Sequence, residues 1–368
     1  MEHYQTIVIG GGAAGLMSAI TYARNKKSSQ GLLVIEKNIT LGRKITVTGN
    51  GRCNLTNLNT APDKYYGQNT KCLYNIFNRF SYKDTIIFFE GLGVRLKTED
   101  GDRIFPITNQ AITVLDLLIE EITRLNISTK TGEQVVHLTP KGKGWEITTD
   151  KGIYQSKSVI LSTGGKSYPQ LGSSGDGFEF ARHLGHRIIE PRPALVPMEL
   201  VGNWYHKLQG VKTDAEITIV VQGKTMATKA GEVLFTHYGI SGPVIIDLSR
   251  LIMDYLPKQS SAVLINFFPG YTTESLKQLL TMRWQAQPQK TFLNSLFGLL
   301  PKKLCIVLAR ELEIEETICV GQISKKELHR IADRLTHWTI EVKKTRPFSE
   351  SMVTAGGVAM DEVNSRTE

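Results

Sequence analysis

Residues 6–36 contain the feature that most constrains the fold. An apolar stretch, TIVIGGGAAG (6–15), runs straight into glycines, and a second one, LLVIE (32–36), ends on an acid. Gly10 permits a tight turn after a strand, Gly12 has no side chain to block a pyrophosphate, and Gly15 lets a helix pack close to the sheet. This order predicts a dinucleotide-binding βαβ unit.

The segment between the two strands, Ala13 to Asn25, is expected to be a helix whose free N–H groups point at the phosphates. Glu36 follows the glycines by about 20 residues, where a carboxylate accepts hydrogen bonds from ribose hydroxyls. This acid favours an adenosine with a free 2′-hydroxyl. It does not by itself distinguish FAD from NAD.

Composition narrows the class of protein. The chain has 368 residues, enough for two or three domains, and no apolar run of the roughly 18 residues that a membrane span requires. Its net charge of +9 is spread thinly, which favours solvated surface cations over a nucleic-acid surface. We therefore expect a cytoplasmic protein with neither a membrane nor a nucleic acid as partner.

The four cysteines are scattered and form no CxxC pair. This excludes a flavin disulfide reductase that depends on a close cysteine pair, and no metal-ligand spacing accompanies them, so we expect no metal. Cys53 is expected to be a small buried side chain rather than a catalyst.

Periodicity predicts helices at 75–90 and 111–125 and strands at 126–131, 134–139, 144–149 and 152–156, which would form a small β-meander. A further apolar strand, 158–161, ends on glycines and returns the chain to the cofactor. After prolines 191, 193 and 197, antiparallel strands are expected at 216–221 and 263–268, helices over 272–335 and a late strand at 337–345.

The densest polar and glycine-rich stretch is GRKITVTGNGRCNLTN (42–57). Its glycines expose backbone N–H groups, and Arg43, Lys44 and Arg52 supply positive charge. Such a loop can hold an anion or the electron-rich edge of a reduced flavin. The alternative is a surface loop whose cations face water, but its position just after the second strand favours the site.

Three further residues are candidates for contact with a substrate. Phe105, after a turn at 99–103, suits an apolar wall, and Tyr168, in a segment with five glycines (164–177) that could wrap a ligand, can stack or donate a hydrogen bond. His237 lies among glycines and hydroxyls and is the best general acid/base by environment. The alternatives are a loop anchor for Tyr168 and a structural histidine at 237.

Taken together, GGGAAGL, GRKITVTGNGRCNLTN, EDGDRIFP, STGGKSYPQLGSSGDGF, PALVPMEL, GEVLFTHYGISGP and VTAGGV resemble the BaiN-like bacterial FAD-binding flavoproteins, among them the streptococcal aminoacetone oxidases. The resemblance implies an α/β fold: a Rossmann-like FAD-binding domain with a β-meander (1–192, continued by 350–368), an inserted antiparallel β-domain (193–270, continued by 335–349) and a small helical domain (271–334).

The same resemblance implies FAD as the cofactor. By position it assigns the pyrophosphate to Gly10, Gly12, Ala13, Ala14 and Gly15 and the ribose to Glu36 and Lys37. It assigns contacts along the length of the cofactor to Arg43, Lys44, Gly51, Arg52, Cys53 and Asn54. The adenine is assigned to Val135, and a second glycine turn to Thr163, Gly164 and Gly165.

For aminoacetone-like substrates the implied activity is oxidation of a small amine or amino ketone, with O2 as acceptor and hydrogen peroxide as product. The alternatives are an NAD(P)H-dependent reductase of an enone or steroid-like substrate, a catalytically weak, FAD-poor remnant and a basic RNA-associated flavoprotein. In the family a further glycine-rich stretch and a closing helix follow VTAGGV, whereas this chain stops at residues 364–368. We therefore expect weakened FAD binding. The sequence does not specify an oligomeric state.

Overall fold

The computed structural model describes residues 2–67, 70–253, 255–256 and 259–364. The chain divides into two units, residues 1–191 with 356–368, and residues 192–355. Both passages between them run through strands that pair as a two-stranded sheet, β10 (Ile188–Ala194) and β17 (Val353–Val358). The last residues of the chain, 365–368, on which the expectation of a missing segment partly rests, lie outside the described part.

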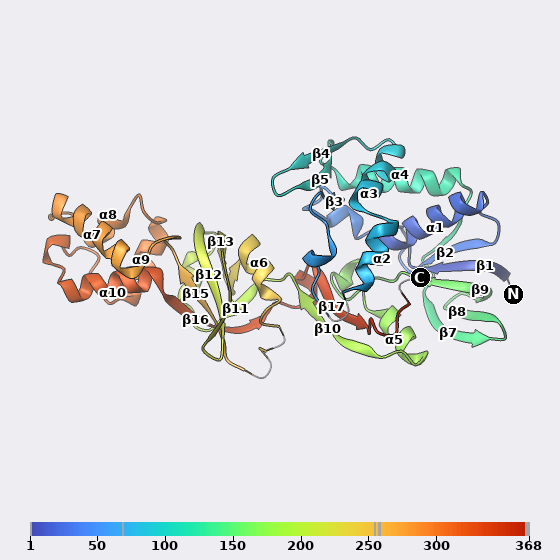
Figure 1. The fold of residues 1–368 in the computed structure, drawn as a ribbon. Coiled ribbons are helices and arrows are strands. Elements are labelled where there is room, and N and C mark those ends of the chain that lie inside the picture. The colour runs from blue at the N-terminus through green and yellow to red at the C-terminus, as the bar shows by residue number, and fades with distance from the viewer. Residues whose placement is uncertain (1, 68–69, 254, 257–258, 365–368) are drawn as a thin grey trace. The chain divides into compact units, whose positions relative to one another are not determined.

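The first unit is built on a six-stranded sheet in the order β6-β2-β1-β9-β8-β7, in which β6, β2, β1 and β9 run parallel (Figure 1). Besides its share of β10 and β17, the unit contains the following strands and helices: β1 (Glu2–Ile9), α1 (Ala13–Lys26), β2 (Leu32–Glu36), β3 (Thr56–Asn57), α2 (Cys72–Arg79), α3 (Tyr82–Gly91), β4 (Leu96–Glu99), β5 (Arg103–Pro106), α4 (Ala111–Arg124), β6 (Ser128–Thr131), β7 (Val135–Lys141), β8 (Gly144–Thr149), β9 (Ile153–Leu161) and α5 (Asp176–His183).

Alternating side chains give the parallel strands two buried faces, as expected for a sheet covered on both sides. Val8 and Val34 pack with α1 and α4 in one apolar cluster, whereas Ile7 and Ile9 face the opposite cluster, which includes Phe180 of α5. The predicted Rossmann-like α/β class is confirmed.

Two details of the sequence prediction are wrong. The single helix expected at 75–90 is two helices, because Ser81 and Asp84 form a capping box that starts α3, with the Asp84 carboxylate accepting from the Ser81 backbone N–H at 2.7 Å. The strand expected at 126–131 is not part of the meander: as β6 it pairs in parallel with β2. The meander is β7-β8-β9, and β9 joins the two strands expected at 152–156 and 158–161.

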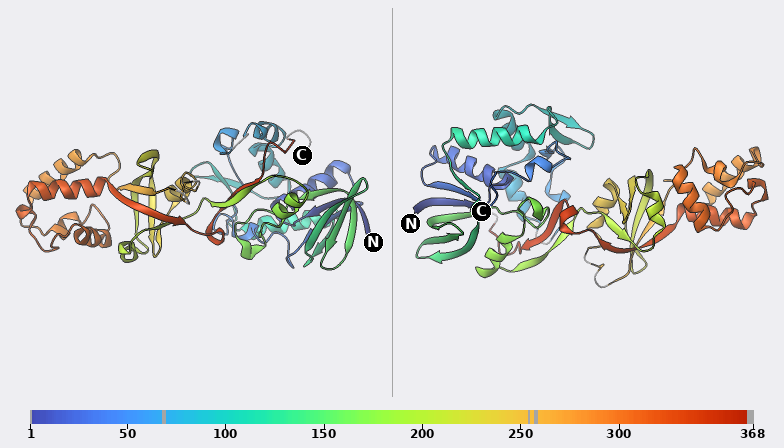
Figure 2. Two further views of the ribbon diagram at one scale, coloured as in Figure 1. Left: turned by 90° about the horizontal axis from the view of Figure 1, so that it is seen from below. Right: turned by 180° about the vertical axis from the view of Figure 1, so that it is seen from behind.

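The second unit contains a closed barrel in the order β11-β14-β13-β12-β15-β16. Helices α7 to α10 gather at one end of it (Figure 2) and share its apolar core. The separate helical domain expected at 271–334 stays a prediction. The elements are β11 (Met198–Leu200), β12 (Lys212–Val221), β13 (Lys224–Thr236), β14 (Gly239–Ser241), α6 (Pro243–Ser249), β15 (Ser261–Asn266), α7 (Thr273–Ala286), α8 (Phe292–Leu296), α9 (Lys302–Glu311), α10 (Lys325–Thr336) and β16 (Trp338–Thr345).

Within the described residues, no helix has the combination of length and apolar character needed to cross a bilayer.

Helix α4 supports residues 42–45, the first part of the glycine-rich stretch. The packing of this helix can be tested by a substitution at Leu118. The side chain of Leu118 is 1% exposed. We expect Leu118→Ala to lower the free energy of unfolding by about 2–5 kcal/mol, because it leaves a cavity in the apolar cluster that Leu118 shares with Val8, Val34 and residues of α1. Ile112→Ala, on the same helix at 47% exposure, is the matched control. Equal stability of the two variants in urea unfolding would contradict this packing.

Candidate functional site

The glycines after β1 have distinct surroundings. A Cβ on Gly15 would lie 1.8 Å from the Gly10 carbonyl oxygen, so α1 can pack here only without a side chain. Gly10 itself has φ +105° and lies against the backbone of Ser162. Gly12, the N-cap of α1, has nothing within 4 Å of its Cβ position. The start of α1 is therefore packed tightly against the end of β1 at Gly15, whereas the space around the Cβ position of Gly12 is open.

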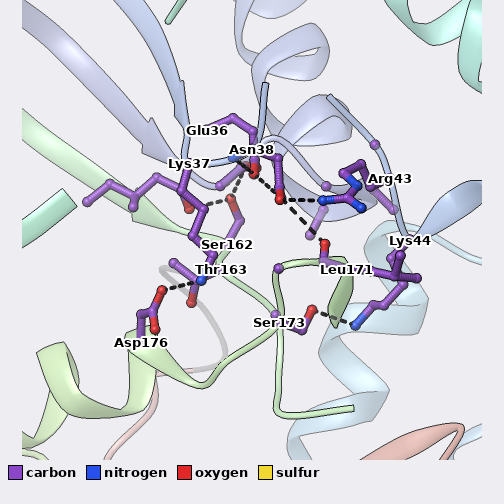
Figure 3. A pocket seen from close by; sticks show the side chains of 18 of the residues that line it. Glu36, Lys37, Asn38, Arg43, Lys44, Ser162, Thr163, Leu171, Ser173 and Asp176 are labelled. Carbon is purple, nitrogen blue, oxygen red and sulfur yellow. Dashed lines mark hydrogen bonds and ion pairs between the residues drawn. The ribbon is translucent and has the colours of Figure 1, made fainter. Parts of the chain in front are cut away.

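In front of it lies a cavity of about 290 Å³, shown in Figure 3. It gathers the ends of β1, β2 and β9 with the loops that follow them. Of the residues that the sequence assigns to a cofactor, those lining the cavity are Gly10, Gly12, Ala13, Ala14, Glu36, Lys37, Arg43, Lys44, Val135, Thr163 and Gly164. The glycine-rich segment expected to wrap a ligand also contributes Gly172, Ser173 and Asp176.

Glu36 ends β2 with its carboxylate almost buried, at 8% exposure. One oxygen, Oε2, accepts the backbone N–H of Gly11 at 2.7 Å. The other, Oε1, accepts the backbone N–H of Asn38 at 2.8 Å and its side-chain amide at 2.6 Å. These bonds hold a hydrogen-bond acceptor at the rim of the cavity, as a ribose site requires.

Lys37 and Lys44, two of the cationic side chains that line the cavity, are held by residues 173–176, at the end of the β9–α5 loop and the start of α5. Lys37 donates to Asp176 at 2.6 Å and also to Ser174, and Lys44 donates to Ser173 at 2.9 Å (Figure 3). Burial lowers the pKa of the Lys44 ammonium from its ordinary value of 10.5. Positive charge thus lies beside the open start of α1, which suits a phosphate group.

Val135 and Phe180 contribute apolar surface to the cavity wall. Glu133 lies there too, buried, and accepts the hydroxyl of Thr149 at 2.6 Å and that of Tyr154 at 2.7 Å. The sequence analysis named neither Asn38 nor Glu133, and it included Ser173 and Asp176 only as members of the segment expected to wrap a ligand. Only the closeness of Asn38 to Glu36 and the five glycines around Ser173 could have pointed to any of them.

The structure brings another predicted group together away from the cavity lining. Arg52 pairs with Glu99 at 2.9 Å, and its guanidinium stacks 4.3 Å from the ring centre of Phe105, which is buried. Cys53 is buried with φ +63°, and burial raises the pKa of its thiol. The predicted residues outside the lining are Gly15, Gly51, Arg52, Cys53, Asn54, Phe105, Gly165, Tyr168 and His237. Their assigned roles stay predictions.

Two of these side chains have well-defined surroundings. Tyr168 adopts φ +57° at the start of a short 3₁₀ turn, Pro169–Leu171. His237 is exposed in the second unit, with its ring edge-on to Tyr238 at 4.9 Å. No group of three or more His, Cys, Asp or Glu side chains that could hold a metal occurs among the residues that the structure covers.

Comparison with known proteins gives matches along the whole chain. The family described as HI0933-like protein Rossmann domain matches residues 4–368. A 3-dehydro-bile acid delta(4,6)-reductase of Clostridium scindens is 32% identical over 97% of this chain and 87% of the relative, and a ribosomal RNA dihydrouridine synthase of Escherichia coli is 27% identical over 100% and 88%. Among solved structures, the open conformation of a flavocytochrome c3 fumarate reductase aligns with 99% of this chain and 69% of its own, at 14% identity and a TM-score of 0.44.

Gly12 and Gly15 make a matched pair for testing the cavity. Gly12→Ala places a methyl group in open space, so we expect stability within about 1 kcal/mol of the wild type but FAD affinity lower by roughly 10-fold or more, because the backbone can no longer approach a pyrophosphate. Gly15→Ala forces α1 off the sheet and should cost about 3 kcal/mol. Thermal unfolding and FAD titration measure both. Unchanged FAD affinity in Gly12→Ala would contradict the assignment.

Lys44 predicts a pH dependence. Burial lowers its pKa below the ordinary value of 10.5, so its ammonium loses its charge at a lower pH than that of an exposed lysine. We expect FAD affinity to weaken as pH rises through this lowered pKa, since an attraction to phosphate disappears. Lys44→Arg keeps its charge over this range and should give a flatter profile. Parallel profiles for the two proteins in equilibrium FAD titrations would show that Lys44 does not contribute.

Proposed function

Because the chain belongs to the HI0933-like family of FAD-binding Rossmann-domain proteins, we propose that it is an FAD-dependent reductase of a carbon–carbon double bond conjugated to a carbonyl group. The observation that carries the proposal is the chemistry shared by the two full-length relatives. The names delta(4,6)-reductase of a 3-dehydro-bile acid and dihydrouridine synthase both denote addition of hydrogen to such a bond.

The cavity residues fit the ADP half of FAD. The open Gly12 and the free N–H groups of the first turn of α1 provide an anion site, and Lys44 and Arg43 add positive charge beside it. Glu36 provides a fixed acceptor for a ribose hydroxyl. Val135 and Phe180 offer an apolar wall for a base. These features support FAD as the resident cofactor.

When bound and reduced by a nicotinamide donor, FAD would supply the hydride that saturates a double bond of this kind. The protein's part is to bind and orient. Glu36 would hold the ribose and the start of α1 the pyrophosphate of the ADP group, and the Ser173–Lys44 and Asp176–Lys37 contacts hold the β9–α5 loop beside them. Arg52, held by Glu99 and Phe105, stiffens the glycine-rich loop at 42–57. His237 is the proposed general acid/base, because it lies among glycines and hydroxyl-bearing residues in the sequence.

The amine oxidase predicted from the sequence motifs is the competing proposal. It requires the same cofactor and the same cavity but takes electrons from an amine such as aminoacetone and passes them to O2. The two proposals therefore differ in which compound reduces the flavin and which compound reoxidises it.

Anaerobic mixing distinguishes them. The FAD-loaded full chain is mixed with NADH, NADPH or aminoacetone, and the flavin absorbance band is followed; the reduced protein is then offered an enone, uridine or O2. We expect bleaching by a nicotinamide and recovery with an enone-type acceptor in the absence of O2. Bleaching by aminoacetone, with recovery and hydrogen peroxide only when O2 is added, would overturn the reductase and support the oxidase.

A further inference from the structure

The side chain of Asn38 joins three parts of the nucleotide cavity (Figure 3). Its amide nitrogen donates to Oε1 of Glu36 at 2.6 Å and to the Leu171 carbonyl at 3.4 Å, while its amide oxygen accepts from Arg43 at 3.0 Å. Because its donor and its acceptor are both engaged, the orientation of the amide is fixed by its partners.

The bonds to Glu36 limit what that carboxylate can still accept. A carboxylate has about four lone-pair positions, two on each oxygen. Among the described residues, the donors to Oε1 are the backbone N–H and the amide of Asn38, and the donor to Oε2 is the backbone N–H of Gly11. Oε1 is therefore filled, and one acceptor position is left, on Oε2.

Packing keeps Asn38 in this position. A Cβ on Gly172 would lie 2.4 Å from the Asn38 amide nitrogen, so the 171–173 segment passes directly against the side chain. The same segment is tied to the other wall through Ser173 and Lys44, at 2.9 Å. The amide has no room to swing away and release Oε1.

We propose that Asn38 is a positioning residue that restricts Glu36 to a single ribose hydroxyl of the adenosine. The Glu36 carboxylate then accepts a hydrogen bond from one of the two hydroxyls and makes none with the other. Without the Asn38 amide, Oε1 regains an acceptor position and Glu36 can accept both. The proposal rests on binding of FAD in this cavity and not on the substrate of the reductase.

Displacement of FAD tests it without any turnover. The FAD-loaded full chain is titrated with ADP, 2′-deoxy-ADP or 3′-deoxy-ADP, and release of FAD is followed by flavin fluorescence. In the wild type we expect one deoxy analogue to bind about 10-fold more weakly than ADP, the effect of one hydrogen bond to a charged group. The other analogue should match ADP within about twofold.

In Asn38→Ala the contrast between the two analogues should shrink to about twofold or less, because either hydroxyl can then be accepted. Asn38→Leu has a similar volume, loses the donor to Glu36 without adding charge and should give the same flattening if the alanine variant is unstable. Asn59→Ala, on an exposed loop of the same unit, is the control and should keep the wild-type contrast.

Three results would overturn the proposal. Equal weakening of both deoxy analogues in the wild type would show that Glu36 reads both hydroxyls, and no weakening of either would show that it reads none. Loss of affinity for all three nucleotides by one factor in Asn38→Ala or Asn38→Leu, with the contrast retained, would assign Asn38 a merely structural role. A failed reductase assay would leave these measurements unaffected, because nucleotide displacement needs no substrate.

Discussion

Helix α1 packs against the end of β1 so closely that a single methyl group on Gly15 would lie 1.8 Å from the Gly10 carbonyl oxygen. The rest of the site depends on this contact. It fixes the start of α1 at the carboxyl edge of the parallel strands, where Glu36 at the end of β2 and Ser162 after β9 also arrive. An anion site, a hydroxyl acceptor and a returning loop therefore meet at one edge of the sheet.

Polar contacts then hold the side chains that line the cavity. Glu36 is held by Gly11 and Asn38, and the cations Lys37 and Lys44 are held by Asp176 and Ser173. The bonds to Gly11, Asp176 and Ser173 join segments from different parts of the chain. These bonds hold the lining side chains in defined positions, which reduces the entropy lost when a ligand binds.

The part of the site that could be predicted from sequence is local. The glycines at 10, 12 and 15 and the acid at 36 depend on spacing within one βαβ unit, and spacing can be read directly. Asp176 and Ser173 lie more than a hundred residues from their lysine partners, so only the folded chain brings them together. The break between α2 and α3 was missed because apolar periodicity continues through Ser81, whereas the capping box stops the helix there. The sequence places Arg52 along the cofactor because of its charge. Its contacts with Glu99 and Phe105 depend on the β4–β5 hairpin, of which the sequence shows only the turn.

The central claim is that this cavity holds the ADP half of FAD, with the ribose on Glu36 and the pyrophosphate at the start of α1. A crystal structure of the full chain with FAD bound tests it most directly. The account predicts a ribose hydroxyl within hydrogen-bond distance of Oε2 of Glu36 and phosphate oxygens facing the backbone N–H groups that follow Gly12. Density for FAD outside this cavity, or a ribose turned away from Glu36, would contradict it.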